Sequence, residues 1–174
     1  MTDARSSDAS PAGAHSSGVR PTDAELRDQL VGTYRVVAVE SVDEDGDVRQ
    51  PFGEDPAGYI AYTPEGYMMA ILSRRDRPRF ADGDIMGGSE PERAQAFLEA
   101  SAFVGRFEVR DGRVAHYLDV ATFQNWVGTA QVRDFEVTDG GLVLRTPFLL
   151  MDGKPRSSVV RLVRTSPSES DVTQ

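Results

Sequence analysis

Short runs of alternating apolar and polar residues, separated by turn-forming residues, recur along most of this chain. Residues 33–40 are rich in β-branched and aromatic side chains, which favour a strand, and a DEDGD turn follows at 43–47. Three β-hairpins are predicted after it, with turns at residues 64–66, 111–112 and 139–140, and residues 157–164 form a last strand. The pattern therefore predicts an all-β chain of about eight or nine antiparallel strands, nearly all joined locally.

The turn positions fix the register of each hairpin, and the register assigns the two faces. The hairpin around 111–112 places one set of side chains on its inner face: Phe103, Gly105, Phe107, Val109, Val114, His116, Leu118 and Val120. The hairpin around 139–140 places a second set there: Gln131, Arg133, Phe135, Val137, Leu142, Leu144 and Thr146. Both faces of the hairpin around 64–66 are apolar, and we favour the first of two sets as the inner one: Tyr62, Met68, Ala70 and Leu72 over Tyr59, Ala61, Tyr67 and Met69.

Two short helices interrupt the strand pattern. A T-x-x-E capping box at residues 22–25, followed by Leu26 and Leu30, predicts one or two helical turns before the first strand. A second capping box begins at Ser89, and an apolar stripe follows it at helical spacing: Ala94, Phe97, Leu98 and Ser101. We expect this second helix to close one end of a barrel.

The order of these elements predicts the fold class. There is no internal repeat and no βαβ alternation, so consecutive hairpins predict a single up-and-down antiparallel β-barrel over residues 22–165. Closure of the barrel removes exposed strand edges. Residues 1–21 and 166–174 are mostly small and polar, and they cannot bury enough apolar surface to offset their ordering entropy. Both ends are expected to be disordered tails.

The composition narrows the choice of partners. The formal net charge of -9 and the pI near 4.7 disfavour binding to nucleic acid or to an anionic membrane. The chain has no cysteine, which excludes disulfides, thiolate metal ligands and a cysteine nucleophile. No apolar run suggests a secretory signal or a membrane span, so the expected location is the cytoplasm. The sequence leaves open whether the protein is a monomer or a homodimer.

Several segments resemble the bacterial lipocalin-like domain family when they are taken in order. They are LVGTYRVVAVE, PFGEDPAGYIAYTPEGYMMA, RPRFADGD, NWVGTAQVRDFEV and LRTPF, and together they cover roughly residues 28–164. The tripeptide 32–34, Gly-Thr-Tyr, stands where lipocalins at large carry G-x-W, which implies that Tyr34 is the aromatic residue closing the barrel base.

The resemblance implies a small lipocalin-like barrel with an internal cavity, but it does not imply a single activity. Relatives of this kind occur beside natural-product pathways. Some lipocalin-like and allene-oxide-cyclase-like barrels are cofactor-free cyclases, whereas other lipocalins only carry ligands. The resemblance supplies no catalytic set of residues for this chain.

Metal, cofactor and hydrolase chemistry find little support in the sequence. Only two histidines occur, one of them His15 in the expected tail, and no H-x-H or carboxylate cluster has ligand spacing. There is no G-x-S-x-G motif, and the glycine motifs that bind phosphate are absent. We therefore expect no metal and no cofactor.

The candidates for chemistry are polar side chains on the expected inner face. His116 could act as an acid or base near neutral pH, or it could be a core histidine held by a carbonyl or a water. Arg133, with Gln131 near it, cannot stay unpaired inside a barrel, so it should meet a ligand oxygen or an internal carboxylate. Glu40 shares the face of Tyr34 if strict alternation holds, which makes it both the expected ion-pair partner and a third candidate catalytic group.

An adaptable apolar pocket would be lined by large side chains from the same face or near it. With Gln131, the candidate ligand-binding residues are Tyr62, Met68, Phe107, Leu118, Trp126, Phe135 and Phe148. The alternative is that these residues simply form the core.

Two functions remain open at this point. The first is a cofactor-independent cyclase, isomerase or dehydratase acting on a polyketide-like hydrophobic molecule, with His116 as acid or base and Arg133, helped by Glu40 or Tyr62, polarising oxygens. The second is a non-catalytic protein that carries a hydrophobic metabolite. Inward-facing polar side chains in an apolar interior motivate the first, and the same interior serves the second.

Overall fold

The computed structural model describes residues 20–165, so the two expected tails lie outside it except for residues 20 and 21. The helices are α1 (Asp23–Leu30), α2 (Glu90–Leu98) and a 3-10 turn, η1 (Gln124–Trp126). The strands are β1 (Gly32–Asp43), β2 (Val48–Arg49), β3 (Pro56–Tyr62), β4 (Tyr67–Arg74), β5 (Ala100–Arg110), β6 (Arg113–Ala121), β7 (Ala130–Thr138), β8 (Gly141–Arg145), β9 (Leu149–Met151) and β10 (Lys154–Arg164).

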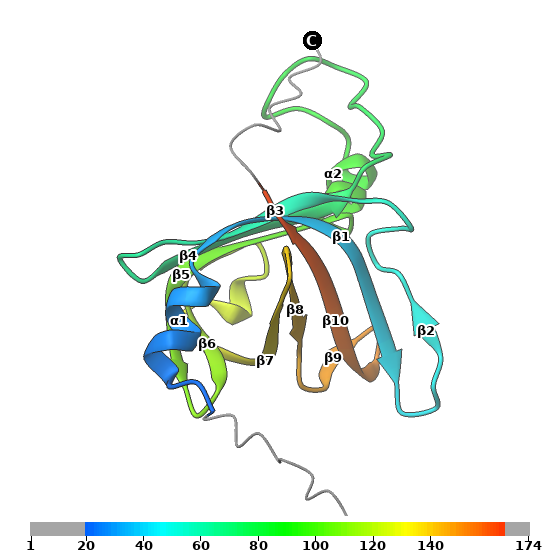
Figure 1. The fold of residues 1–174 in the computed structure, drawn as a ribbon. Coiled ribbons are helices and arrows are strands. Elements are labelled where there is room, and N and C mark those ends of the chain that lie inside the picture. The colour runs from blue at the N-terminus through cyan, green and yellow to red at the C-terminus, as the bar shows by residue number, and fades with distance from the viewer. Residues whose placement is uncertain (1–19, 166–174) are drawn as a thin grey trace, which may run out of the picture.

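Eight of these strands close into an antiparallel barrel (Figure 1). The order around it is β1, β3, β4, β5, β6, β7, β8 and β10, and β10 pairs back with β1 to complete the circle. The short strands β2 and β9 extend the edges of β1 and β10. The predicted all-β, up-and-down, lipocalin-like barrel is confirmed. No helix within residues 20–165 is both long and apolar enough to cross a membrane.

The predicted hairpin registers hold where the Asp-Gly turns set them. Arg110 pairs with Arg113 across one turn, so Phe107 pairs with His116 and both point inward. In the apolar hairpin the favoured inner set is also confirmed, because its members are all buried: Tyr62, Met68, Ala70 and Leu72. A tight turn transmits its register because side chains alternate with period two.

A β-bulge changes the predicted register at the far end of the hairpin around 111–112. The pairing shifts between Val104 and Gly105, so that Asp119 is an extra residue on β6. An extra residue reverses the alternation beyond it. Val120, expected on the inner face, is therefore 64% exposed. Its expected inward placement is wrong for this reason.

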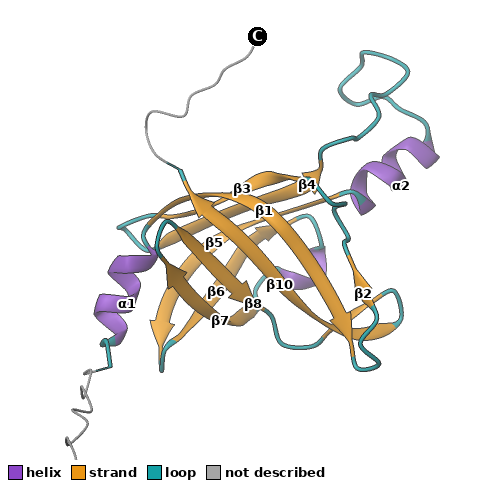
Figure 2. Cartoon of the chain, turned by 45° about the vertical axis from the view of Figure 1, so that its right-hand side comes forward, coloured by secondary structure: helices purple, strands orange, loops and turns teal. Residues whose placement is uncertain are grey.

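Helix α1 covers one end of the barrel, which we call the base (Figure 2). Leu30 is fully buried there, and the Tyr34 hydroxyl donates to its carbonyl at 3.0 Å. The Arg164 guanidinium lies 4.7 Å from the Tyr34 ring centre. It also donates a hydrogen bond to the Val31 carbonyl at 2.9 Å and so caps the C-terminal end of the helix. Tyr34 thus occupies the position that the resemblance implied for it.

Helix α2 begins at the predicted capping box, with Ser89 as N-cap, but none of its residues is buried. Figures 1 and 2 show it outside the barrel, near the end of β4. Phe97 and Leu98, two members of the expected apolar stripe, are exposed. The expectation that this helix closes a barrel end is corrected: α1 covers the base, because only α1 inserts a large side chain between the strands.

Candidate functional site

A chain of three buried polar side chains crosses the barrel interior. Tyr62 comes from β3, His116 from β6 and Arg133 from β7. The Tyr62 hydroxyl lies 3.0 Å from His116 Nε2, and Arg133 Nη1 lies 2.5 Å from His116 Nδ1. The alternation along each strand points these side chains into the barrel. The contact between Tyr62 and His116 depends on the curvature of the closed barrel, since β3 and β6 are not neighbouring strands.

The two hydrogen bonds that link Arg133, His116 and Tyr62 have a fixed direction. A guanidinium can only donate hydrogen bonds, so His116 Nδ1 accepts from Arg133. A neutral imidazole then carries its single proton on Nε2, which donates to the Tyr62 oxygen. The Tyr62 hydroxyl proton is left without an acceptor among the residues that the structure describes. This proton, together with the remaining Arg133 N–H groups, can be offered to a ligand.

Aromatic rings surround the three polar side chains. Phe107 packs edge-on against Tyr62 with ring centres 5.0 Å apart, and the Arg133 guanidinium lies 5.3 Å from the centre of the Phe103 ring. Burial, and then the charge of Arg133, hold the pKa of His116 well below its usual value. Burial also raises the pKa of Tyr62. His116 is therefore neutral and Tyr62 is protonated at physiological pH.

The protonation states of Tyr62, His116 and Arg133 limit what these three side chains can do chemically. His116 has no vacant lone pair, because Nδ1 already accepts from a permanent cation and Nε2 carries the proton. Within residues 20–165, no carboxylate lies within ion-pair distance of His116 or Arg133 to act as a base in its place. The arrangement is suited to donating hydrogen bonds and poorly suited to accepting a proton.

Solvent reaches the interior along one wall. Gln131, Phe135 and Val137 point inward from β7, yet each is only partly buried. The inward residues of the neighbouring strand, Leu142 and Leu144, are fully covered. The inner face of β7 is therefore the part of the barrel wall where inward side chains next to Arg133 stay partly exposed.

The other expected pocket residues divide into two groups. Met68, Phe107 and Leu118 are buried in the core, and Trp126 of η1 packs partly buried against it, with its ring centre 5.7 Å from that of Phe103. Phe148 is 54% exposed in the segment between β8 and β9. Its expected place in the pocket is wrong, because the inward alternation of β8 ends at Arg145.

Glu40 does not join the site. The pairing of β1 with β10 shifts between Val36 and Ala38, which reverses the alternation along the rest of β1. Glu40 points outward and lies 3.6 Å from Arg161, while Val39 takes the inner position. The expected inward placement of Glu40 is wrong, and Arg133 loses its expected carboxylate partner.

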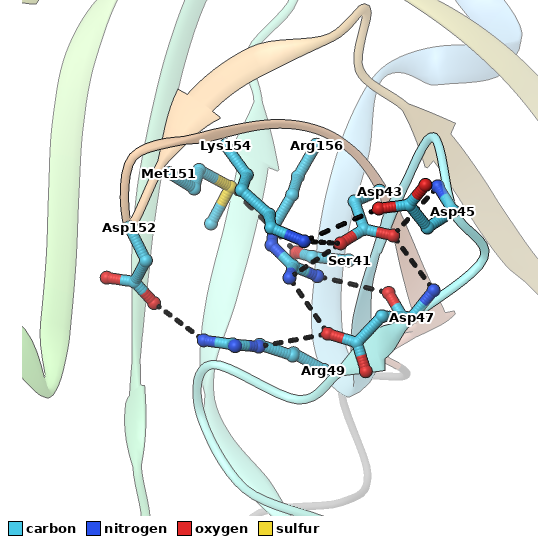
Figure 3. A network of polar contacts seen from close by, with 9 residues as sticks. All are labelled: Ser41, Asp43, Asp45, Asp47, Arg49, Met151, Asp152, Lys154 and Arg156. Atoms are coloured by element: carbon cyan, nitrogen blue, oxygen red, sulfur yellow. Dashed lines mark hydrogen bonds and ion pairs between the residues drawn. The ribbon is translucent and has the colours of Figure 1, made fainter.

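A second buried polar cluster, which the sequence did not indicate, lies where β1 ends and β10 begins, at the ends of these strands away from α1 (Figure 3). Arg156 of β10 is 2% exposed and donates to Asp43 at 3.0 Å and to Asp47 at 2.9 Å. Beside it the hydroxyls of Ser41 and Ser158 lie 2.7 Å apart. The cluster fastens the turn after β1 to β10.

Only the β1 bulge could have revealed this cluster. Strict alternation places Ser41 and Asp43 on the outer face, where a run of acidic residues is ordinary. Once one residue is inserted near Ala38, both turn inward and require a buried partner. The partner is distant in sequence, since Asp43 and Arg156 are 113 residues apart.

A cavity of about 350 Å³ lies outside the barrel, between α2 and the segment before it. It is lined by residues such as Arg77, Phe80, Gln95 and Glu99. It shares no residue with the Tyr62–His116–Arg133 chain. This cavity is therefore a separate feature from the polar side chains inside the barrel.

His116 predicts a pH dependence of stability. Below pH 6.5 the unfolded chain takes up a proton at this histidine, whereas the folded protein, with its lowered pKa, does not. Unfolding then binds a proton, so stability falls as the pH falls, by at most about 1.4 kcal/mol per pH unit between about pH 6.5 and 5. Urea unfolding at several pH values measures this slope. His116→Gln should flatten it in that window and His15→Gln should not, and an equal slope in wild type and His116→Gln contradicts the assignment.

Comparison with known proteins identifies the family of this chain. The family model of the lipocalin-like domain matches residues 31–165, which is nearly all of the described barrel. The chain belongs to the lipocalin-like domain family. A relative from Aspergillus oryzae, named a 4'-hydroxy-3'-methoxypropiophenone carrier protein, is 30% identical over 87 residues, covering 45% of this chain and 78% of that protein.

Among solved structures, this member of the lipocalin-like domain family is similar to a mutant of the fluorescent protein UnaG. The two chains are 14% identical, with a TM-score of 0.34, over 79% of this chain and 97% of the other.

Proposed function

We propose that this lipocalin-like protein binds a largely apolar small molecule inside its barrel and carries it without changing it chemically. The observation that carries the proposal is the hydrogen-bonded series from Arg133 through His116 to Tyr62, which is buried among aromatic rings beside the partly exposed inner face of β7. Fixed donors in an apolar interior are typical of sites that orient a ligand through its acceptor oxygens.

The alternative, a cofactor-free cyclase, isomerase or dehydratase, needs a group that exchanges protons with its substrate. His116 was the expected group, but both of its nitrogens are engaged and its pKa is lowered. The Aspergillus relative is named as the carrier of an aryl ketone, which also favours a carrier over an enzyme. An aryl ketone offers the kind of oxygen that Tyr62 could recognise.

Binding can be tested with the intrinsic fluorescence of Trp126, the single tryptophan, which packs against Phe103. The probes are 4'-hydroxy-3'-methoxypropiophenone and the neutral apolar dye Nile red, followed by chromatography of the extracted compound after several hours. Saturable binding and recovery of the unchanged compound are expected.

The Tyr62→Phe variant should bind the ketone about tenfold more weakly, because it removes one hydrogen-bond donor to the ligand. Tyr59→Phe is the matched control, since Tyr59 lies on the same strand but is half exposed on the outer face. Its affinity should equal that of wild type.

Two results would contradict a carrier. Conversion of the ketone to a new product that His116→Gln abolishes establishes the enzyme instead. Failure of both probes to bind, or equal affinities for Tyr62→Phe and wild type, removes the interior site from consideration.

A further inference from the structure

The barrel contains two buried arginines, and their surroundings differ in one respect. Arg156 contacts two carboxylates, those of Asp43 and Asp47, at 3.0 Å and 2.9 Å. Arg133 is 6% exposed, yet no carboxylate of the described chain lies within ion-pair distance of it. The Arg156 guanidinium therefore has two carboxylate counter-ions, whereas the Arg133 guanidinium has none among the described residues.

The neighbours of Arg133 do not offset that charge. His116 accepts one hydrogen bond from Nη1 but is neutral, and Phe103 contributes the weak attraction of a ring face. A buried charge without a counter-ion is unfavourable by several kcal/mol, so it usually persists where a ligand supplies the opposite charge. Of five guanidinium N–H groups, the structure gives one a hydrogen-bond partner.

We propose that the ligand supplies the missing negative charge: it is an otherwise apolar molecule with an acidic oxygen, bound as the anion against the Arg133 guanidinium. The shared chemistry is an anionic oxygen, which a phenol or a carboxylic acid can provide. The proposal rests on the proposed carrier function and names the class of ligand for the same site.

The position of Arg133 on β7 agrees with this class of ligand. Its neighbours on the inner face of that strand, Gln131 and Phe135, are only partly buried, and the proposal places the apolar part of the ligand against them with its acidic oxygen at the guanidinium. Tyr62 and His116 are the titratable groups that face Arg133 from the elements packed around it within residues 20–165. Neither carries a negative charge that would compete with the ligand.

The test uses two pairs of probes. The two members of each pair have closely similar structures, but only one of them is acidic. The phenol pair is 4'-hydroxypropiophenone and its methyl ether, and the carboxylate pair is 4-phenylbutanoic acid and its primary amide. Affinities are measured by calorimetry for wild type, Arg133→Met and Arg133→Lys. Arg161→Met, on the outer face of β10, serves as the control.

At least one acidic probe should bind wild type and the control about tenfold or more tightly than its neutral partner, because charge-assisted hydrogen bonds are roughly twice as strong as neutral ones. Arg133→Met should abolish this preference and Arg133→Lys should keep part of it. A bound phenol should show phenolate absorption at a pH below its free pKa in wild type and not in Arg133→Met. The pair that shows the preference identifies the source of the anion.

Two outcomes overturn the proposal and can be told apart. If the neutral probes bind as tightly as the acidic ones and Arg133→Met changes neither, the ligand is neutral and the carrier function stands. If neither pair nor Nile red binds, the carrier function falls together with the proposal.

Discussion

Replacing Arg156 with methionine should lower the free energy of unfolding by about 3 kcal/mol, whereas replacing Arg133 with methionine should leave it unchanged or raise it. Both arginines are buried. Removal of Arg156 leaves the covered Asp43 carboxylate with only Lys154, at 3.4 Å, as a cationic partner. Removal of Arg133 leaves no charge behind, because it has no carboxylate partner among residues 20–165. We therefore expect the Arg156 guanidinium to stabilise the fold and the Arg133 guanidinium to be neutral or unfavourable for stability.

Urea unfolding at neutral pH measures both effects. Arg49→Met is the control for Arg156→Met, because Arg49 contacts the same Asp47 from an exposed position and should change stability by no more than about 0.5 kcal/mol. A loss for Arg133→Met as large as that for Arg156→Met would mean that Arg133 has an internal counter-charge, which would also remove the case for an anionic ligand.

Gly105→Ala should lower the free energy of unfolding by about 3 kcal/mol, at the upper end of overpacking effects. A Cβ atom at this position would lie 1.8 Å from the Tyr117 carbonyl oxygen and 2.9 Å from the Leu118 Cα. Both are backbone atoms at the bulge between β5 and β6, so no side chain can rotate away. The two strands must separate next to Phe107 and His116, and ligand affinity should fall as well.

Gly83→Ala is the matched control, since a Cβ there meets no atom within 4 Å. Thermal unfolding of the two variants gives the comparison, and only Gly105→Ala should shift the midpoint by several degrees. An unchanged midpoint for Gly105→Ala would show that the bulge accommodates a methyl group by a small backbone movement.

Local signals in the sequence were sufficient for the hairpins. An Asp-Gly turn fixes which residues face each other, and period-two alternation then carries the assignment along both strands. This reasoning placed His116 and Arg133 inside, although nothing in either segment shows that the two side chains touch. It also placed the capping boxes that begin α1 and α2.

The bulges explain two of the wrong placements, those of Glu40 and Val120. One extra residue on β1 sends Glu40 outward and turns Ser41 and Asp43 inward, and one on β6 exposes Val120. Neither bulge has a mark in its own segment, such as a glycine at the inserted position. The mismatch becomes visible only when the partner strand is known.

The sequence by itself determined that this chain forms consecutive β-hairpins with a histidine and an arginine on their inner faces, because turns and alternation act over a few residues. The tertiary structure decided which of those polar groups meet and which charges are neutralised. Tyr62 and His116 are 54 residues apart, and Asp43 and Arg156 are 113 residues apart. Contacts over such separations depend on barrel closure and on the register shift at each bulge, and both are properties of paired strands that no single segment contains.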